Sequence, residues 1–192
     1  MKTIIQFFVI LICTSIYCFS QTDSIQKITE ERNKQLARNF YEDLWFNNRT
    51  DNYSKYMAEE YVAHDIGDRK DLVEPAIEQK YIADRFWNDG EMSGRIDYQI
   101  ADGDLVATRW LWSMEGNSMM GKLYETKNLP IINVFRFNDD GKIVEVWNHR
   151  HDIDTNQTLR FTIKGLLIGL LIALIPTIIA FRYKRRLKKL SQ

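Results

Sequence analysis

The sequence predicts an α+β domain in which a cone-shaped, curved antiparallel sheet packs on N-terminal helices, followed by one C-terminal transmembrane helix. Two observations carry this prediction. Hydrophobic residues recur with a helical period in the first part of the chain and with a period of two from Arg95 onward. A long uncharged segment then lies close to the C-terminus. The 192 residues suffice for one domain with short appendages.

Three helices are expected before the sheet. In the first, apolar residues from Ile25 to Leu44 recur at spacings of three, four or their sum, which places them on one stripe among charged residues. A second, short helix is expected over residues 51–58. The third is expected over residues 71–87, with Pro75 in its first turn, where a missing amide hydrogen costs little.

Four strands are expected to form an antiparallel meander after these helices. The first alternates over residues 95–100, and "ADGD" then supplies a hairpin turn. The second, residues 105–114, is β-branched and aromatic on both faces, as in a central strand that is covered on both sides. The third covers residues 131–137, and a second Asp-Gly hairpin leads to the fourth, residues 143–151. Curled round the helices, this sheet would enclose one apolar cavity.

Both ends of the chain resemble membrane-targeting segments. Residues 1–20 combine one lysine, a short apolar core and the small residue Ser20, which is typical of a cleaved secretory signal peptide. An uncleaved signal anchor is the alternative. Residues 161–181, with the uncharged run Gly165–Phe181, reach the roughly 20 residues needed to cross a bilayer. A buried core helix is the alternative, but the run is apolar on all sides and a basic tail follows at once.

The basic tail, residues 182–192, predicts the orientation in the membrane. It holds six Lys and Arg residues, whereas only Arg160 and Lys164 flank the other side of the apolar run. The positive-inside rule therefore places the C-terminus in the cytoplasm. The domain over residues 21–156 would then face outward from the cytoplasmic (or inner) membrane, in the periplasm or outside the cell, as part of a single-pass protein.

Charge and cysteine content exclude several classes of function. Residues 21–156 hold 17 Lys and Arg against 26 Asp and Glu, a net charge of −9. Such a domain does not suit nucleic acid, whose recognition needs a basic surface. Cys13 and Cys18 both lie in the expected signal peptide, so the rest of the chain has no disulfide or thiolate chemistry. We expect no cofactor.

The strand sequences resemble a known family. "ADGDLVATRWLW" (101–112), "VFRFNDDGKIVEVWNHRHD" (134–152) and, upstream, "YVAHDIGDRKDLVEPAIEQ" (61–79) resemble the SnoaL-like polyketide cyclases, within the nuclear transport factor 2-like fold. The resemblance covers about Gln35 to Asp152. It implies a conical α+β barrel with a pocket between the sheet and the helices. In the family's cyclases, an aspartate one residue after the last-strand tryptophan is the acid/base group; here Asn148 follows Trp147.

Asn148 separates two functional hypotheses. An amide has no useful pKa near neutrality, although it can exchange hydrogen bonds with a carbonyl or a hydroxyl group. The first hypothesis is therefore a membrane-anchored module that binds a small apolar or aromatic ligand in its cone. The second is a lyase or isomerase that acts on a carbonyl compound by proton transfer, with His64 or His149 replacing the missing acid. A third is an interaction module that forms a homodimer through its sheet.

The pocket residues follow from the resemblance and from strand alternation. The resemblance directs Asn148 into the pocket, and Arg150 shares its face of the last strand. Trp110, Trp112 and Tyr124 would line the pocket and stack on a flat ligand. As core residues they would need no ligand at all.

The three histidines allow several interpretations. His64, beside Asp65, is a candidate base or a residue that ties a loop by hydrogen bonds. His149 and His151 share the other face of the last strand with Ile143, Glu145 and Trp147. Their spacing suits zinc or copper ligation. The alternatives are a solvated or interfacial outer face and a catalytic role for His149. Local spacing supplies no third ligand, so we assign no metal site.

Overall fold

The structure is a computed structural model that describes residues 24–64, 69–150 and 157–190. Its chain divides into two units, Met1–Arg150 and His151–Gln192. The expected signal peptide, residues 1–20, lies outside the described residues, and so does His151.

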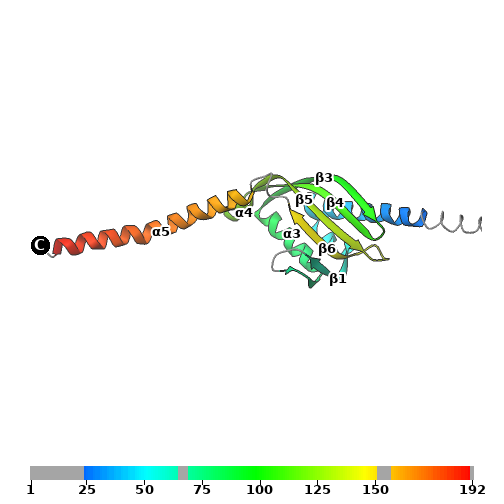
Figure 1. Cartoon of the computed structure of the whole chain (residues 1–192), viewed down its shortest axis with the longest axis horizontal. Helices are drawn as coiled ribbons and strands as arrows, with labels where there is room; N and C mark the ends of the chain where they lie inside the picture. Colours follow the sequence, from blue (N-terminus) through cyan, green and yellow to red (C-terminus); the bar gives the residue numbers. More distant parts are fainter. Residues whose placement is uncertain (1–23, 65–68, 151–156, 191–192) are drawn as a thin grey trace, which may run out of the picture. The chain divides into compact units, whose positions relative to one another are not determined.

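The described part of the first unit starts with a helix over residues 24–40 that continues into a π-helix, η1 (Tyr41–Phe46). The helix predicted from Ile25 to Leu44 is confirmed, but its first turns, blue in Figure 1, project beyond the sheet. Ile25 and Ile28 are accordingly 66% and 70% exposed. Only the later part of the apolar stripe, which ends in the fully buried Leu44, packs against the sheet.

The second and third predicted helices are shorter than expected. A 3-10 turn, η2 (Thr50–Asn52), leads into helix α2 (Tyr53–Tyr56), and strand β1 (Met57–His64) starts immediately afterwards. Strand β2 (Leu72–Pro75) occupies what was expected to be the first turn of a helix, and helix α3 (Ile77–Asp89) follows it. Proline disfavours the helical conformation in the residue before it, so Glu74 is extended and the helix begins after Pro75.

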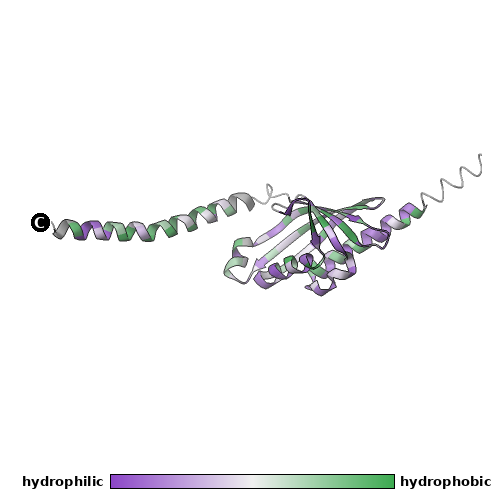
Figure 2. Cartoon of the chain, turned by 90° about the horizontal axis from the view of Figure 1, so that it is seen from below, coloured by the Kyte–Doolittle hydropathy of each residue, from purple (hydrophilic) through white to green (hydrophobic). Residues whose placement is uncertain are grey.

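The sheet has six strands in the order β2-β1-β6-β5-β4-β3. The predicted antiparallel meander is confirmed by β3 (Gly90–Asp102), β4 (Leu105–Gly116), β5 (Thr126–Phe137) and β6 (Ile143–Arg150). A short helix, α4 (Met119–Tyr124), connects β4 to β5. The two added strands make the sheet mixed, because β1 pairs in parallel with β6. Figures 1 and 2 show the curved sheet with helices on one side.

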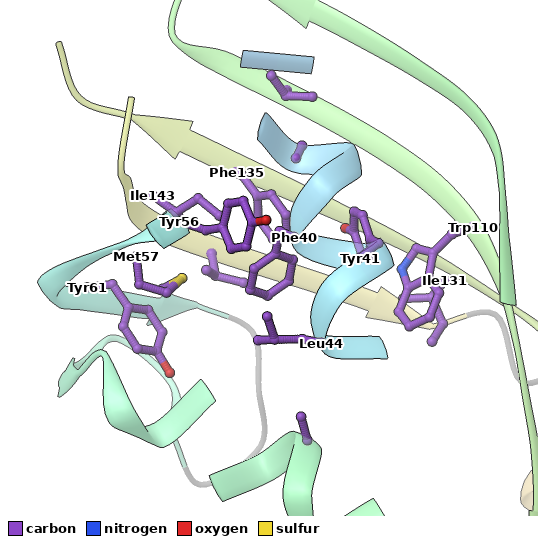
Figure 3. Packing of buried hydrophobic residues seen from close by; sticks show 14 of the residues in the cluster. Phe40, Tyr41, Leu44, Tyr56, Met57, Tyr61, Trp110, Ile131, Phe135 and Ile143 are labelled. Carbon is purple, nitrogen blue, oxygen red and sulfur yellow. The ribbon is translucent and has the colours of Figure 1, made fainter. Parts of the chain in front are cut away.

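The sheet face that the helices cover, called the interior face below, is packed with aromatic side chains (Figure 3). Tyr41 of η1 stacks on Phe135 of β5, with ring centroids 5.6 Å apart, and lies 5.0 Å from the ring of Trp110. Phe40 meets Phe135 edge to face at 5.4 Å. Such edge-to-face and offset contacts add to the free energy gained by burying the rings.

One buried asparagine supplies the polar connection in this aromatic core. Asn133 Oδ1 accepts hydrogen bonds from the Tyr41 hydroxyl (3.0 Å) and from Trp110 Nε1 (2.8 Å). Its amide nitrogen donates to the carbonyl oxygen of Trp147 (3.3 Å). A single side chain thereby joins η1, β4, β5 and β6, and it gives two buried donors their acceptor.

The second unit is dominated by a long helix, α5 (Gln157–Leu190). Its stretch Phe161–Leu187 is long and apolar enough to cross a membrane, and none of its most apolar window is buried. Pro176 lies inside the helix, and the Thr177 hydroxyl donates to the carbonyl oxygen of Ala173 (2.8 Å). Side-chain bonds of this kind are one way in which membrane helices tolerate proline. The predicted helix over Gly165–Phe181 is confirmed, as one that could span a membrane.

We predict that Asn133→Ala lowers the free energy of unfolding by about 2 kcal/mol or more, because two buried donors lose their acceptor. Tyr41→Phe should cost about 1 kcal/mol, since it removes one hydrogen bond without leaving an orphan. In the Asn133→Ala background, Tyr41→Phe should cost almost nothing. Urea unfolding of the full chain in detergent, followed by tryptophan fluorescence, measures this cycle. Additive costs would show that the two side chains act independently.

Candidate functional site

Cross-strand pairing places the polar residues of β6. Asn148 pairs with Asn133, so it lies on the interior face as expected. Trp147 and His149 pair with Val134 and Ile132 and lie on the outer face, where His149 is exposed. The alternation of β6 over this part of the strand therefore matches the prediction.

Ile143 departs from that alternation. Strand parity places it on the outer face, yet it is fully buried against the core. The pairing shifts here, because Glu145 pairs with Arg136 while Ile143 pairs with Phe137, which leaves Val144 as an extra residue. A bulge of this kind reverses the faces of the residues before it. The assignment of Ile143 to the outer face is therefore wrong.

Asn148 carries a buried polar atom without a partner. Its Oδ1 makes no hydrogen bond within the described chain. Most buried polar atoms are hydrogen-bonded, and leaving one unpaired costs about 1–3 kcal/mol. Trp112 on β4 shows the same feature, since its buried Nε1 has no acceptor among the described residues. Among the described residues, the interior face thus presents an unpaired acceptor at Asn148, an unpaired donor at Trp112 and the unpaired hydroxyl of Thr126, which pairs with Met114 across β4 and β5.

Trp110 and Trp112, which were both predicted to line the pocket, are buried in the structure. Trp110 is core: Tyr41, Trp45 and Phe46 pack around it at ring distances of 5.0, 5.8 and 5.9 Å. Trp112 meets Phe86 of α3 edge to face at 5.2 Å, and it is likewise buried.

Two further predicted pocket residues are placed by backbone alone. Tyr124 is the last residue of α4, and Arg150 ends β6 opposite Ile131. The side chains of both lie outside the described structure.

His64 lies on the outer face, away from Asn148. It pairs with Trp147 across the parallel β1–β6 contact and stacks on that indole ring at 4.5 Å. Its Nδ1 is 2.8 Å from Asp71 Oδ1, and its Nε2 is 2.9 Å from Glu145 Oε2. The hydrogen bond to Asp71, with that to Glu145, raises the pKa of His64 above 6.5. This geometry matches a histidine that ties a loop. The expected partner Asp65 lies outside the described residues.

A buried cluster that sequence reasoning missed surrounds Tyr61. Its hydroxyl donates to Glu74 Oε2 (2.5 Å) and accepts from Gln79 (2.7 Å) and Arg69 (2.9 Å). Arg69 also forms an ion pair with Glu74. Burial raises the pKa of Tyr61, and Arg69 lowers the pKa of Glu74. The phenol thus stays neutral beside a charged carboxylate. With three partners, its hydroxyl is saturated, so the cluster fixes β1, β2 and α3 together.

A surface pocket of about 570 Å³ lies at the other end of β6 from Asn148. The Lys142 ammonium at its edge donates to the carbonyl oxygens of Ser54 and Lys55, both at 2.8 Å. Within the described ranges, no group of three His, Cys, Asp or Glu side chains could hold a metal ion. The pocket is lined by Tyr53, Ser54, Met57, Ala58, Glu59, Pro75, Ala76, Ile77, Asn138, Asp140 and Lys142.

We predict that protonated His64 stabilises the fold. Because its folded pKa is raised, this contribution is complete below about pH 6.5 and is lost as pH rises through the folded pKa. The difference in free energy of unfolding between wild type and His64→Gln should therefore shrink from about pH 6 to about pH 9. Asp71→Asn, which removes the main cause of the raised pKa, should flatten the wild-type profile. A pH-independent difference would contradict the assignment.

The profile of the SnoaL-like polyketide cyclases matches residues 35–159. A candidate polyketide cyclase from Acidithiobacillus ferrooxidans is 21% identical, with a TM-score of 0.57 over 67% of this chain and 94% of its own. A LEH-like epoxide hydrolase from M. tuberculosis is 18% identical, with a TM-score of 0.53 over 77% of this chain and 98% of its own. No curated protein sequence matches this chain.

These structural likenesses show the nuclear transport factor 2-like fold alone, because the identities are low. The family match is more specific, since it covers well over half of the chain and includes the whole meander and Asn148. The chain belongs to the SnoaL-like polyketide cyclase family.

Proposed function

We propose that this chain is a single-pass membrane protein whose SnoaL-like domain, held outside the cytoplasm, binds a small apolar or aromatic ligand at the interior face. The observation that carries the proposal is the buried, unpaired Oδ1 of Asn148. An apolar interior that keeps such an atom gives up stability unless a ligand pairs with it. Family members use the interior for small molecules, and this position marks where a ligand's polar group would sit.

Binding is favoured over proton transfer by the chemistry of the interior face. General acid/base catalysis needs a titratable group within reach of the substrate. The described side chains on the interior face of β4, β5 and β6 include no carboxylate and no imidazole. His64 and His149 lie on the outer face. A lyase or isomerase acting on a carbonyl compound would need its acid or base from elsewhere, so that function ranks second.

The unpaired atoms of Asn148 and Trp112 indicate the polarity of the ligand. Asn148 Oδ1 accepts, so it suits a hydroxyl or N–H group. Trp112 Nε1 donates, so it suits a carbonyl or ether oxygen. Their surroundings are apolar and aromatic, including Phe86, Leu129 and Ile131. We therefore propose a ligand that is largely apolar and carries few polar groups.

The location of the domain is proposed from α5 and the charges that flank it. The uncharged run Gly165–Phe181 of α5 is followed directly by six basic residues between positions 182 and 189. Basic residues remain preferentially on the cytoplasmic side. The acidic domain before the helix would then lie outside, and the homodimer expected from its sheet stays a prediction.

The ligand is tested by asking which small molecules remain bound to the full chain after purification. Native mass spectrometry of the wild type should show a largely apolar molecule with a hydrogen-bond donor. Asn148→Leu, which keeps the bulk but removes the acceptor, should lose most of it, because a good hydrogen bond is worth about 0.5–1.5 kcal/mol, or up to about tenfold in affinity. Asn88→Leu, at an exposed position of α3, is the matched control. Equal retention by both variants would count against the interior site.

The topology is tested by adding a protease outside intact cells or spheroplasts. We expect digestion of the domain and survival of a C-terminal tag fused after Gln192, because the lipid bilayer protects the cytoplasmic tail. Permeabilised cells, in which both sides are digested, are the control. A protected domain with a digested tag would reverse the proposed orientation.

A further inference from the structure

The end of the interior face next to α4 holds two buried polar side chains without partners. Trp112 on β4 is 6% exposed, and Thr126, the first residue of β5, is 5% exposed. Neither Trp112 Nε1 nor Thr126 Oγ1 makes a hydrogen bond within the described chain. By contrast, the buried hydroxyls of Thr50 and Thr108 are both hydrogen-bonded. Since almost all buried polar atoms in proteins are paired, two unpaired atoms on this part of the face indicate a partner from outside the chain.

A β-bulge in β5 brings Thr126 to the interior face. In the register that joins most of β4 and β5, Met114 would pair with Lys127. The register shifts by one residue, so Met114 pairs with Thr126 instead. Asn128 takes a left-handed conformation, with φ 54°, and its amide donates to the Ser113 hydroxyl at 2.9 Å. The bulge thus places a small hydroxyl side chain among the buried residues and leaves the charged Lys127 exposed.

Trp112 and Thr126 are diagonal neighbours on this face. Trp112 precedes Met114, the partner of Thr126, by two residues and points to the same side of β4. Diagonal neighbours lie about 7–8 Å apart, within reach of a side chain as large as an indole. Around them lie the apolar Phe86, whose ring is 5.2 Å from that of Trp112, and Leu129, which is 1% exposed. One ligand oxygen between the two can accept from the indole N–H and also bond the hydroxyl.

These two side chains lie far from Asn148 on the same face. Asn148 pairs with Asn133, and Asn133 pairs with Thr108 on β4. Trp112 follows Thr108 by four residues, which is about 13 Å along the strand. Two strand spacings, about 10 Å, separate β6 from β4. The unpaired atoms at the two places are therefore about 16 Å apart, so one molecule that bonds at both must be elongated.

We propose that Trp112 and Thr126 form a second anchor of the interior site, where they hold the carbonyl or hydroxyl oxygen of an elongated ligand. The other end of this ligand donates a hydroxyl or N–H group to Asn148 Oδ1. The inference rests on the proposed ligand site at Asn148, and it names the class of molecule: an apolar chain or ring system with a polar group at each end. A molecule too short to reach both anchors bonds at only one of them.

Three probe molecules test the second anchor on the full chain in detergent. Methyl ω-hydroxydodecanoate carries a hydroxyl for Asn148 at one end and an ester carbonyl for Trp112 and Thr126 at the other. Dodecanol keeps the hydroxyl and the chain but lacks the carbonyl. Methyl ω-hydroxyoctanoate carries both polar groups on a chain too short to join the anchors. The rise of the unfolding temperature with probe concentration measures affinity, because a ligand that binds only the folded state stabilises it by mass action.

The variants are Asn148→Leu, Thr126→Val, which removes only the hydroxyl, and Trp112→Phe, which removes the N–H. Thr29→Val in the first helix is the matched control. We expect Thr126→Val to lower the affinity for methyl ω-hydroxydodecanoate about twofold to tenfold, as the loss of one hydrogen bond does, and to leave dodecanol unchanged. Trp112→Phe should act in the same way, whereas Asn148→Leu should weaken both long probes. With the octanoate, at most one of Thr126→Val and Asn148→Leu should matter, because this probe reaches one anchor at a time.

The possible failures are distinguishable. If Asn148→Leu weakens dodecanol but neither Thr126→Val nor Trp112→Phe weakens the dodecanoate, the second anchor is overturned and the proposed site stands. Equal losses of both long probes in Thr126→Val would also overturn the anchor, since the hydroxyl would then serve the packing. Losses from both single substitutions with the octanoate would overturn the elongated shape. If no probe binds the wild type, or if Asn148→Leu changes no affinity, the proposed site and the second anchor fail together.

Discussion

The interior of this domain depends on the shared acceptor Asn133 Oδ1. The Tyr41 hydroxyl and Trp110 Nε1 are both buried, and both donate to this oxygen. Their common bond fixes the angle at which η1 meets β4 and β5, and the aromatic rings then pack around that arrangement. A buried network that is fully satisfied in this way favours one packing over many similar ones.

Asn133 also differs from Asn148, the residue that it pairs with on the next strand. Asn133 and Asn148 are paired residues on the same face, yet one has every polar atom bonded and the other keeps a buried oxygen unpaired. Of these two identical side chains, Asn133 thus serves the packing of the core, whereas Asn148 keeps an oxygen that can accept a hydrogen bond. The position at which the family resemblance implies an acid/base aspartate holds Asn148 in this chain, and it lies on the interior face.

Sequence reasoning succeeded where local signals act alone. The Asp-Gly hairpins and alternating strands predicted the meander, and an uncharged run predicted α5. It failed where residues distant in the sequence determine the local structure. Residues 57–64 alternate poorly, and they become β1 because β6 and β2 pair with them. The cluster around Tyr61 draws on Arg69, Glu74 and Gln79, whose meeting no spacing rule reveals. The bulge at Val144 places Ile143 in the core, and the alternation of residues along the strand does not reveal such a bulge.

The parallel pairing of β1 with β6 has a consequence for the order in which the sheet can form. β6 lies between β1 and β5, although it is the last strand to be synthesised. Until residues 143–150 exist, the β1–β2 hairpin and the β3–β4–β5 sheet share no strand, and each has an open edge. Non-local closure of this kind is slow, because loop entropy must be overcome first. A nascent chain that lacks β6 therefore has two separate sets of strands, each with an unpaired edge that can pair with another chain. The addition of β6 between them joins both sets into one sheet.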